Sequence, residues 1–270
     1  MKSQLERDMH ALELEIGSVV RHVLATAGTV TEYREPLIGF ARAADPRFGD
    51  LRDTVSPIHL MPEELVPGAR TVVSFFLPFA PWVVEANSRE REQVAREWAV
   101  AYVETNALIS CISAQLVETL AERGIAAGTV PATHNFDELT LHSGWSHKSV
   151  AVIAGLGSFG LHQMVITDAG CAGRFGSVVL EAEIPIRETA PRERCSAFYD
   201  GSCLECVARC PVSALDGSEP LDKHRCHEHL HGVARAYEEL GLVDVCGKCA
   251  VGPCSFGSAV PATSRQGSVG

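Results

Sequence analysis

Apolar residues recur at helical spacing in two stretches of the chain. Residues 1–30 alternate charged and apolar positions, which predicts an amphipathic helix. A longer pattern begins near Ser88, a candidate N-cap, and continues with apolar residues at three- and four-residue steps from Val94 to Leu116. Gly124 is suited to end this helix at C′. Such a helix would be about 50 Å long, so we expect a break near its centre.

Short apolar runs rich in β-branched residues predict strands elsewhere. The stretch Thr71–Val84 predicts a buried strand entering a loop, because two prolines interrupt it. Residues 149–154 and Met164–Thr167 predict two strands joined by a glycine-containing turn, and a third strand is expected from Phe175 to Ile184. This succession indicates a hairpin and not a strand followed by a crossover helix.

Three glycines in that turn, Gly155, Gly157 and Gly160, have the spacing G-x-G-x-x-G. In dinucleotide-binding folds this pattern opens a helix whose N-terminus receives the pyrophosphate. Here only Leu161-His162-Gln163 separates the last glycine from the next β-type run, so the pattern lacks its helix. The glycines either permit a tight turn with positive φ or lie against another cofactor.

The chain has 270 residues, 46% of them hydrophobic, which suits one or two globular domains. Composition changes sharply after Pro185, where cysteines become frequent and long apolar runs end. We therefore expect an α/β domain over residues 1–187 that holds a cofactor or substrate, and a cysteine-rich domain over residues 188–270.

The charge and the N-terminal sequence limit the expected partners and compartment. A net charge of −11 disfavours a broad phosphate-binding surface. The N-terminus lacks the features of a signal peptide, and no apolar run reaches the roughly 20 residues of a membrane span. We expect a cytoplasmic protein without a membrane partner, whose ten cysteines serve metal or redox chemistry and not disulfides.

Eight cysteines lie in the last third of the chain. The run C-x2-C-x3-C-P matches the latter part of the bacterial ferredoxin motif, in which the cysteine before proline ligates the other cluster of a pair. We therefore predict two [4Fe-4S] clusters, the first held by Cys195, Cys203, Cys206 and Cys254, and the second by Cys210, Cys226, Cys246 and Cys249. The alternative is a pair of zinc sites, since two C-x2-C pairs also suit zinc.

Other residues are weaker candidates. Cys111 is expected to be a buried hydrophobe and Cys171 an exposed thiol in a glycine turn. We interpret the histidines of the segment 227–231 as a solvated surface near a cluster. Tyr33 and Arg34 could reach a ligand.

The segment "AGLGSFGLH", the hairpin after it and the cysteine spacing resemble the epoxyqueuosine reductases and their relatives, the corrinoid-dependent reductive dehalogenases. The resemblance covers residues 130–260. It implies an α+β protein with a nitroreductase-like α/β N-terminal domain followed by a ferredoxin-like two-cluster domain. Gly155, Gly157 and Gly160 would then lie against a corrinoid such as cobalamin or against a cluster.

The chain departs from the family at several places. Family members carry an acidic proton donor about a dozen residues before the glycine turn, where this chain has Leu141, with Asp137 and Glu138 nearby. Asp200 stands where the first cluster motif usually has a cysteine. The helical-repeat extension that helps epoxyqueuosine reductases hold tRNA has no counterpart before Gly270, as in shorter double-cluster proteins of anaerobes.

Candidate proton donors are therefore Asp137, His142 and His147, the last two because histidine titrates near neutrality. We expect an iron–sulfur oxidoreductase that relays single electrons to a corrinoid or a small-molecule substrate, and that takes them from a ferredoxin- or flavodoxin-type protein. The alternatives are a non-catalytic electron carrier and an epoxyqueuosine (tRNA) reductase. The acidic charge leads us to expect that tRNA is not a partner.

Overall fold

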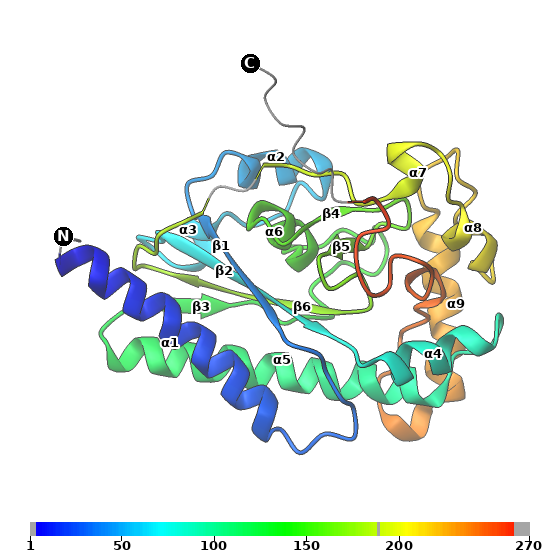
Figure 1. Ribbon diagram of the computed structural model, residues 1–270, viewed down its shortest axis with the longest axis horizontal. Coiled ribbons are helices and arrows are strands. Elements are labelled where there is room, and N and C mark those ends of the chain that lie inside the picture. Colours follow the sequence, from blue (N-terminus) through cyan, green and yellow to red (C-terminus); the bar gives the residue numbers. More distant parts are fainter. Residues whose placement is uncertain (1–3, 188–189, 262–270) are drawn as a thin grey trace.

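The computed structural model describes residues 4–187 and 190–261 (Figure 1). Its centre is an antiparallel four-stranded sheet in the order β1-β2-β6-β3. The strands are β1 (Leu37–Arg42), β2 (Thr71–Pro78), β3 (Ala127–Thr129) and β6 (Gly173–Leu180). Every residue of β2 is buried, which explains its continuous apolar sequence: the sheet is covered on both faces.

Helices form the two layers around the sheet. On one face α1 (Gln4–Thr26) and α5 (Arg96–Glu122) pack against each other and against alternate residues of the central strands (Figure 1). On the other face lie α2 (Arg47–Thr54), α3 (Pro62–Leu65) and α6 (His147–Ile153), which share a second core. The architecture is therefore a mixed α/β fold, as expected, with its sheet antiparallel.

The predicted long helix is two helices. The first, α4 (Pro81–Arg89), begins at a proline, so Ser88 lies within a helix and is not an N-cap. Residues 90–95 separate it from α5, which places the break near one end and not at the centre. The predicted end is confirmed, because Gly124 follows α5 with a φ of 73°.

The predicted strand at residues 149–154 is wrong, because these residues form most of α6. The Ser146 side chain accepts a hydrogen bond from the Ser149 backbone N–H at 3.2 Å and caps the helix. Both sides of this short helix are buried, so its apolar sequence shows no amphipathic period. The hairpin is confirmed: β4 (Gly157–Phe159) pairs antiparallel with β5 (Val165–Thr167).

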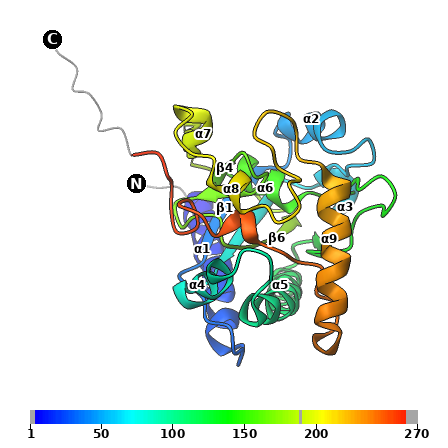
Figure 2. The same ribbon diagram turned by 90° about the vertical axis from the view of Figure 1, so that its right-hand side faces the viewer.

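The C-terminal region consists of short elements arranged beside one end of the sheet (Figure 2). They are α7 (Ser196–Tyr199), α8 (Glu205–Arg209), α9 (Lys223–Ala236) and the 3-10 turns η1 (Glu238–Leu240) and η2 (Lys248–Ala250). Valines of this region pack in one core with aromatic residues near the end of β2 and on α5. The predicted domain boundary at 187/188 adjoins residues 188–189, which lie outside the described residues.

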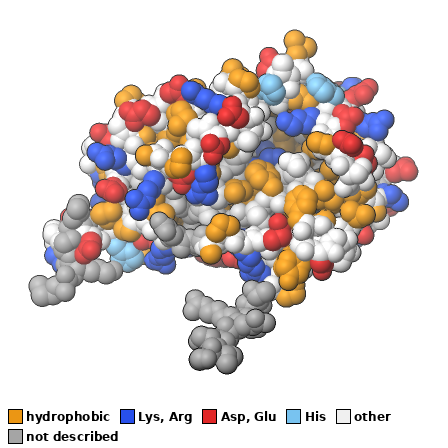
Figure 3. Space-filling model, turned by 90° about the horizontal axis from the view of Figure 1, so that it is seen from above, with side chains coloured by type: hydrophobic (Ala, Val, Ile, Leu, Met, Phe, Trp, Pro, Cys, Tyr) orange, Lys and Arg blue, Asp and Glu red, His pale blue; other side chains and the backbone are white. Residues whose placement is uncertain are grey.

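Figure 3 shows the molecule from above. Charged side chains of both signs are scattered over the left part, whereas hydrophobic side chains gather around a hollow toward the right, the side on which α7, α8 and α9 lie in Figure 1.

Candidate functional site

Four of the predicted ligands surround a small pocket at the C-terminal region. Its lining includes the first predicted set, Cys195, Cys203, Cys206 and Cys254. Burial, together with the charges of the other three sulfurs, raises the pKa of the Cys206 thiol to about 11. These four thiols therefore lie close enough to interact electrostatically, and iron binding would have to displace their protons.

The other four thiols line a larger cavity. Cys210, which follows α8, Cys226 on α9, and Cys246 and Cys249 all contribute to its wall. Burial raises the pKa of Cys246 to about 11, and the charges of Cys226 and Cys210 act in the same direction. Cys249 lines both the small pocket and the cavity, so the two thiol sets adjoin each other.

The spacing of potential ligand atoms bears on the zinc alternative. Tetrahedral zinc with bonds of about 2.3 Å holds its sulfur ligands about 3.8 Å apart. Among the described residues, the one group of three or more potential ligand atoms that all lie within 4.8 Å of one another is His162, Cys171 and Cys254. Neither set of four thiols contains such a group of three, and both zinc and a [4Fe-4S] cluster accept four cysteine ligands.

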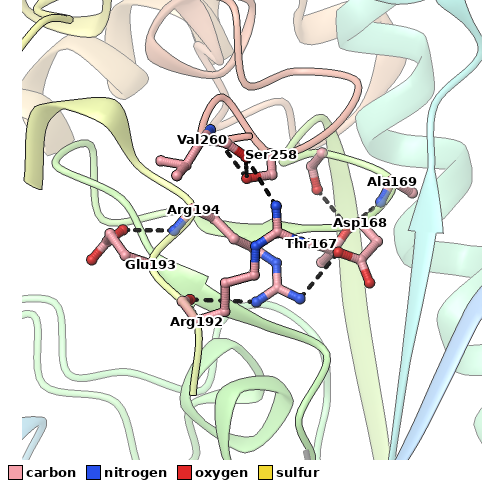
Figure 4. A network of polar contacts seen from close by, with 9 residues as sticks. Thr167, Asp168, Ala169, Arg192, Glu193, Arg194, Ser258 and Val260 are labelled. Atoms are coloured by element: carbon pink, nitrogen blue, oxygen red, sulfur yellow. Dashed lines mark hydrogen bonds and ion pairs between the residues drawn. The ribbon is translucent and has the colours of Figure 1, made fainter. Parts of the chain in front are cut away.

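Figure 4 shows the polar network of the segment that leads into Cys195. The Glu193 carboxylate accepts a hydrogen bond from the backbone N–H of Arg194 at 2.8 Å. It also accepts one from the backbone N–H of Cys195 at 2.7 Å. The Arg194 guanidinium pairs with Asp168 at 3.1 Å, and Arg192 donates to the Val260 carbonyl at 2.9 Å. This segment thus brings Cys195 to the pocket although the usual motif position is Asp200, which instead accepts a hydrogen bond from the backbone of its own turn.

The C-x2-C loop of the second set is held in place by the two residues between its cysteines. Lys248, between Cys246 and Cys249, is 2% exposed and donates to the Asn87 carbonyl, the Asn87 side-chain oxygen and the Glu90 carbonyl, at 2.7, 3.0 and 2.8 Å. Gly247 adopts a φ of 70°, and a Cβ there would lie 2.2 Å from the Trp98 ring. The loop therefore rests against α4 and α5.

The larger cavity has a volume of about 490 Å³ and lies between the sheet and the C-terminal region. Apolar and aromatic side chains form most of its wall, among them Phe79, Trp98 and Phe175. Polar side chains interrupt this wall at several points. They include His147, Lys148, Arg174, His229 and Asp244.

Two of the cations that line the cavity, Arg174 and Lys148, contact neighbouring groups of the protein. The Arg174 guanidinium lies 4.3 Å from the centre of the Tyr102 ring, and Tyr102 donates a hydrogen bond to Asp244 at 2.5 Å. Lys148 donates to the Gln163 carbonyl at 2.9 Å. Burial lowers the pKa of both side chains because it disfavours their charged forms, and a ligand with negative or strongly polar groups would favour those forms again.

His147 is buried and fully hydrogen-bonded. Its Nε2 lies 3.2 Å from the Pro131 carbonyl, which can only accept, so Nε2 carries the proton and Nδ1 accepts from the Ser177 hydroxyl at 2.8 Å. Burial lowers the pKa of His147 to about 4. The histidine is therefore neutral near pH 7, which makes it a poor proton donor, although it lies at the cavity wall.

Asp137 and His142 are not among the described residues that line the cavity. The Asp137 carboxylate accepts hydrogen bonds from the backbone N–H groups of Leu139 and Thr140 and from the Thr140 hydroxyl, and these bonds lower its pKa. It is an ionised turn residue in this structure. Leu141, at the position that matches the acidic donor of the resembling family, adopts a φ of 54° in the same loop.

The three motif glycines do not line the cavity either. Gly155 adopts a φ of 77° after α6, and a Cβ on Gly157 would lie 2.3 Å from the Ile166 carbonyl oxygen across the hairpin. A Cβ on Gly160 would lie 2.9 Å from the His162 ring. Backbone geometry and close packing explain each glycine, and cofactor binding by them stays a prediction.

Several other expectations need correction. Cys111 is exposed on α5, whereas Cys171 is buried. Tyr33 bonds the Thr105 hydroxyl at 2.8 Å and Arg34 donates to the Ala169 carbonyl at 2.6 Å, so both are occupied within the fold, away from the cavity lining.

The histidines of α9 divide between two faces of the helix. The ring nitrogens of His227 and His231 lie 3.0 Å apart, while His229 lines the cavity. Helical spacing could have separated His229 from the other two. The cavity position of Arg174 could not be predicted from the sequence. A single arginine in an apolar strand reads like a residue at the edge of a sheet until the fold is known.

Comparison with known proteins shows which proteins the chain resembles. No family model matches the chain. Curated epoxyqueuosine reductases from Burkholderia pseudomallei and Xanthomonas campestris match it at 26% and 28% identity. Each match covers 63% of this chain. Over this region the chain is similar in sequence to the epoxyqueuosine reductases. It spans less than half the length of these relatives, 45% of each.

Solved structures share the fold. Epoxyqueuosine reductase from Bacillus subtilis matches with a TM-score of 0.58 and 18% identity, over 93% of this chain and 67% of that one. A second structure, an epoxyqueuosine reductase with an epoxyqueuosine-modified tRNA stem loop, matches with a TM-score of 0.54 and 20% identity, over 82% and 57%. The relatives thus include a tRNA-binding protein, so our expectation against tRNA as a partner is wrong.

Proposed function

We propose that this chain is an iron–sulfur reductase of the epoxyqueuosine reductase type, in which two [4Fe-4S] clusters supply electrons to a ligand in the cavity. The observation that carries the proposal is that Cys210, Cys226, Cys246 and Cys249 border the same cavity as residues of the sheet. A cluster held by these thiols would adjoin the bound ligand. When bound, such clusters supply single electrons at low potential.

The order of the two thiol sets suggests the direction of electron flow. Cys249 of the second set also lines the pocket of the first set, so electrons entering at the first cluster would pass through the second before they reach the cavity. A simple electron carrier has no need of a cavity of about 490 Å³ behind its clusters. The cavity therefore favours a reductase over the non-catalytic carrier.

The lining of the cavity fits a corrinoid, the cofactor implied by the family resemblance. Phe79, Trp98 and Phe175 offer apolar surface to a flat macrocycle. Among the described residues, Arg174 Nε and His229 Nε2 are buried atoms without a hydrogen-bond partner, and both side chains line the cavity, where the amide groups of a corrinoid could bond them. A corrinoid supplies a cobalt centre that accepts electrons one at a time.

We propose an epoxyqueuosine-bearing tRNA as the substrate, because the curated relatives are epoxyqueuosine reductases and one solved relative holds such a stem loop. The net charge of −11 makes a broad electrostatic surface for tRNA unavailable, so recognition would rest on the cavity and its cations Lys148 and Arg174. Leu141 cannot donate a proton and Asp137 is not a lining residue, so protons would come from Lys148 or His229 in the cavity wall.

The test is an anaerobic turnover assay with an anticodon stem loop that carries epoxyqueuosine. The protein is reconstituted with iron and sulfide, supplied with cobalamin and reduced with titanium(III) citrate, and conversion to queuosine is followed by mass spectrometry. We expect conversion by the wild type and none by Cys226→Ser, which removes a ligand of the second cluster. No conversion by a protein that retains both clusters and cobalamin would refute this substrate.

A further inference from the structure

The sulfur of Cys254 has two buried neighbours that are not among the eight predicted ligands. His162 Nε2 lies 3.3 Å from Cys254 Sγ, and Cys171 Sγ lies 3.7 Å from it. The two side chains are 4% and 1% exposed. They come from the β4–β5 hairpin and from the turn before β6, segments that the proposed electron relay leaves without a role.

Backbone contacts decide which nitrogen of His162 carries the proton. The backbone N–H of Met164 donates to His162 Nδ1 at 3.1 Å, so Nδ1 is the acceptor of a neutral imidazole. The proton then resides on Nε2, which faces Cys254 Sγ. His162 is therefore oriented as a hydrogen-bond donor to this sulfur.

Cys171 is fixed beside Cys254 by the main chain. Its backbone N–H donates to the Cys254 carbonyl at 3.0 Å, and the next N–H, of Ala172, donates to the Ser255 carbonyl at 3.4 Å. The Cys171 thiol has one proton and two acceptors in reach, the Ala250 carbonyl at 3.6 Å and Cys254 Sγ. Once Cys254 is a metal-bound thiolate, the negatively charged sulfur is the stronger acceptor.

Two glycines make room for this arrangement. A Cβ on Gly160 would lie 2.9 Å from Cε1 and 3.2 Å from Nδ1 of His162. Gly170 adopts a φ of 83°, and a Cβ there would lie 2.1 Å from the Ser255 carbonyl oxygen. The last glycine of the G-x-G-x-x-G pattern thus allows the His162 ring to pack against the hairpin, and Gly170 allows the two cysteine segments to approach.

We propose that His162 and Cys171 are two hydrogen-bond donors to the Cys254 thiolate that raise the reduction potential of the first cluster. The inference rests on the proposed function for the assignment of Cys254 as a cluster ligand. Reduction adds negative charge to the cluster and its sulfurs, so donors to a ligand sulfur stabilise the reduced form more than the oxidised form. The pair would make the first cluster easier to reduce, as suits the point at which electrons enter.

The experiment is an anaerobic redox titration of the reconstituted protein, followed by electron paramagnetic resonance. The variants His162→Leu and Cys171→Ala each remove one donor, and His162→Gln keeps an N–H in place of the imidazole. Cys111→Ala, on the exposed side of α5, is the matched control. Iron and sulfide are measured for every variant.

We expect His162→Leu and Cys171→Ala to keep both clusters and to lower the equilibrium constant for reduction of one cluster about tenfold, which is 59 mV for a one-electron couple. His162→Gln should restore part of the shift, and Cys111→Ala should not move it. Unchanged potentials in both donor variants would overturn the inference. Loss of about half the iron in Cys171→Ala would also overturn it, because Cys171 would then be a ligand. A wild type without iron and sulfide would instead refute the proposed function.

Discussion

Lys248 is expected to stabilise the second C-x2-C loop, and its replacement by methionine tests this most sharply. The ammonium group is buried and donates to three oxygens, two of Asn87 near the end of α4 and one of Glu90, which follows α4. Methionine keeps the apolar stem and a similar length but donates no hydrogen bond. Lys248→Met therefore isolates the three bonds from the packing of the side chain.

The expected loss of stability depends on which oxygens are left without a hydrogen bond. The Asn87 side-chain oxygen keeps a hydrogen bond from the Ala95 backbone N–H at 3.0 Å, so it remains satisfied. The carbonyls of Asn87 and Glu90 lose the bonds that Lys248 gives them. An orphaned buried acceptor costs about 1–3 kcal/mol. Asn87 is buried whereas Glu90 is exposed, so water can replace Lys248 at the Glu90 carbonyl. We therefore expect a loss of about 1–3 kcal/mol in the free energy of unfolding, with part of it offset by removal of a buried charge.

The assay is denaturant unfolding of the reconstituted protein under anaerobic conditions, followed by far-ultraviolet circular dichroism. Lys223→Met is the matched control, because Lys223 is an exposed lysine at the start of α9, and we expect it to change the free energy by less than about 0.5 kcal/mol. A Lys248→Met protein as stable as Lys223→Met would refute the reasoning.

Two further predictions concern the pH dependence of stability and the close contact between Gly170 and the backbone of Ser255. Burial lowers the pKa of His147 from 6.5 to about 4, so the unfolded chain binds this proton more readily, and stability should fall by about 2 kcal/mol between pH 7.5 and 5. Denaturation of His147→Gln over this range should show a smaller dependence, and an equal one would contradict the assignment. Gly170→Ala should lower the free energy of unfolding by about 1–3 kcal/mol more than Gly124→Ala does. Gly124 is the control because its φ is also positive, at 73°, but nothing lies within 4 Å of a Cβ there. Equal losses of stability in thermal unfolding would mean that the close approach of Gly170 to Ser255 is unimportant.

The sequence was most informative where one residue type fixes the chemistry. Cysteine spacing predicted two sets of thiols. In the structure the first set lines the small pocket and the second lines the larger cavity, with Cys249 at both, because C-x2-C loops constrain the chain locally. The strand at Thr71–Pro78 was predicted because burial on both faces leaves a continuous apolar run. Residues 149–154 were wrongly predicted as a strand for the same reason. They form a short helix that is buried on both sides, so their sequence is also continuously apolar and shows no amphipathic period.

The cavity could not be predicted from local pattern. Arg174 and His229 meet there from a strand and a helix far apart in the chain, and only the packing of the C-terminal region on the sheet brings them together. The roles of His162 and Cys171 depend on two hydrogen bonds between the turn before β6 and the segment around Cys254. Such contacts leave no periodic signal in the sequence. The glycines that permit them are visible, but their partners are not.

The most direct test of the account is the content of iron, acid-labile sulfide and zinc in the anaerobically reconstituted protein. Two four-iron clusters predict about eight irons and eight sulfides per chain. Cys203→Ser and Cys226→Ser, one from each thiol set, should each retain about half. About two zinc ions per chain without sulfide would contradict the account, because neither set of thiols would then carry electrons.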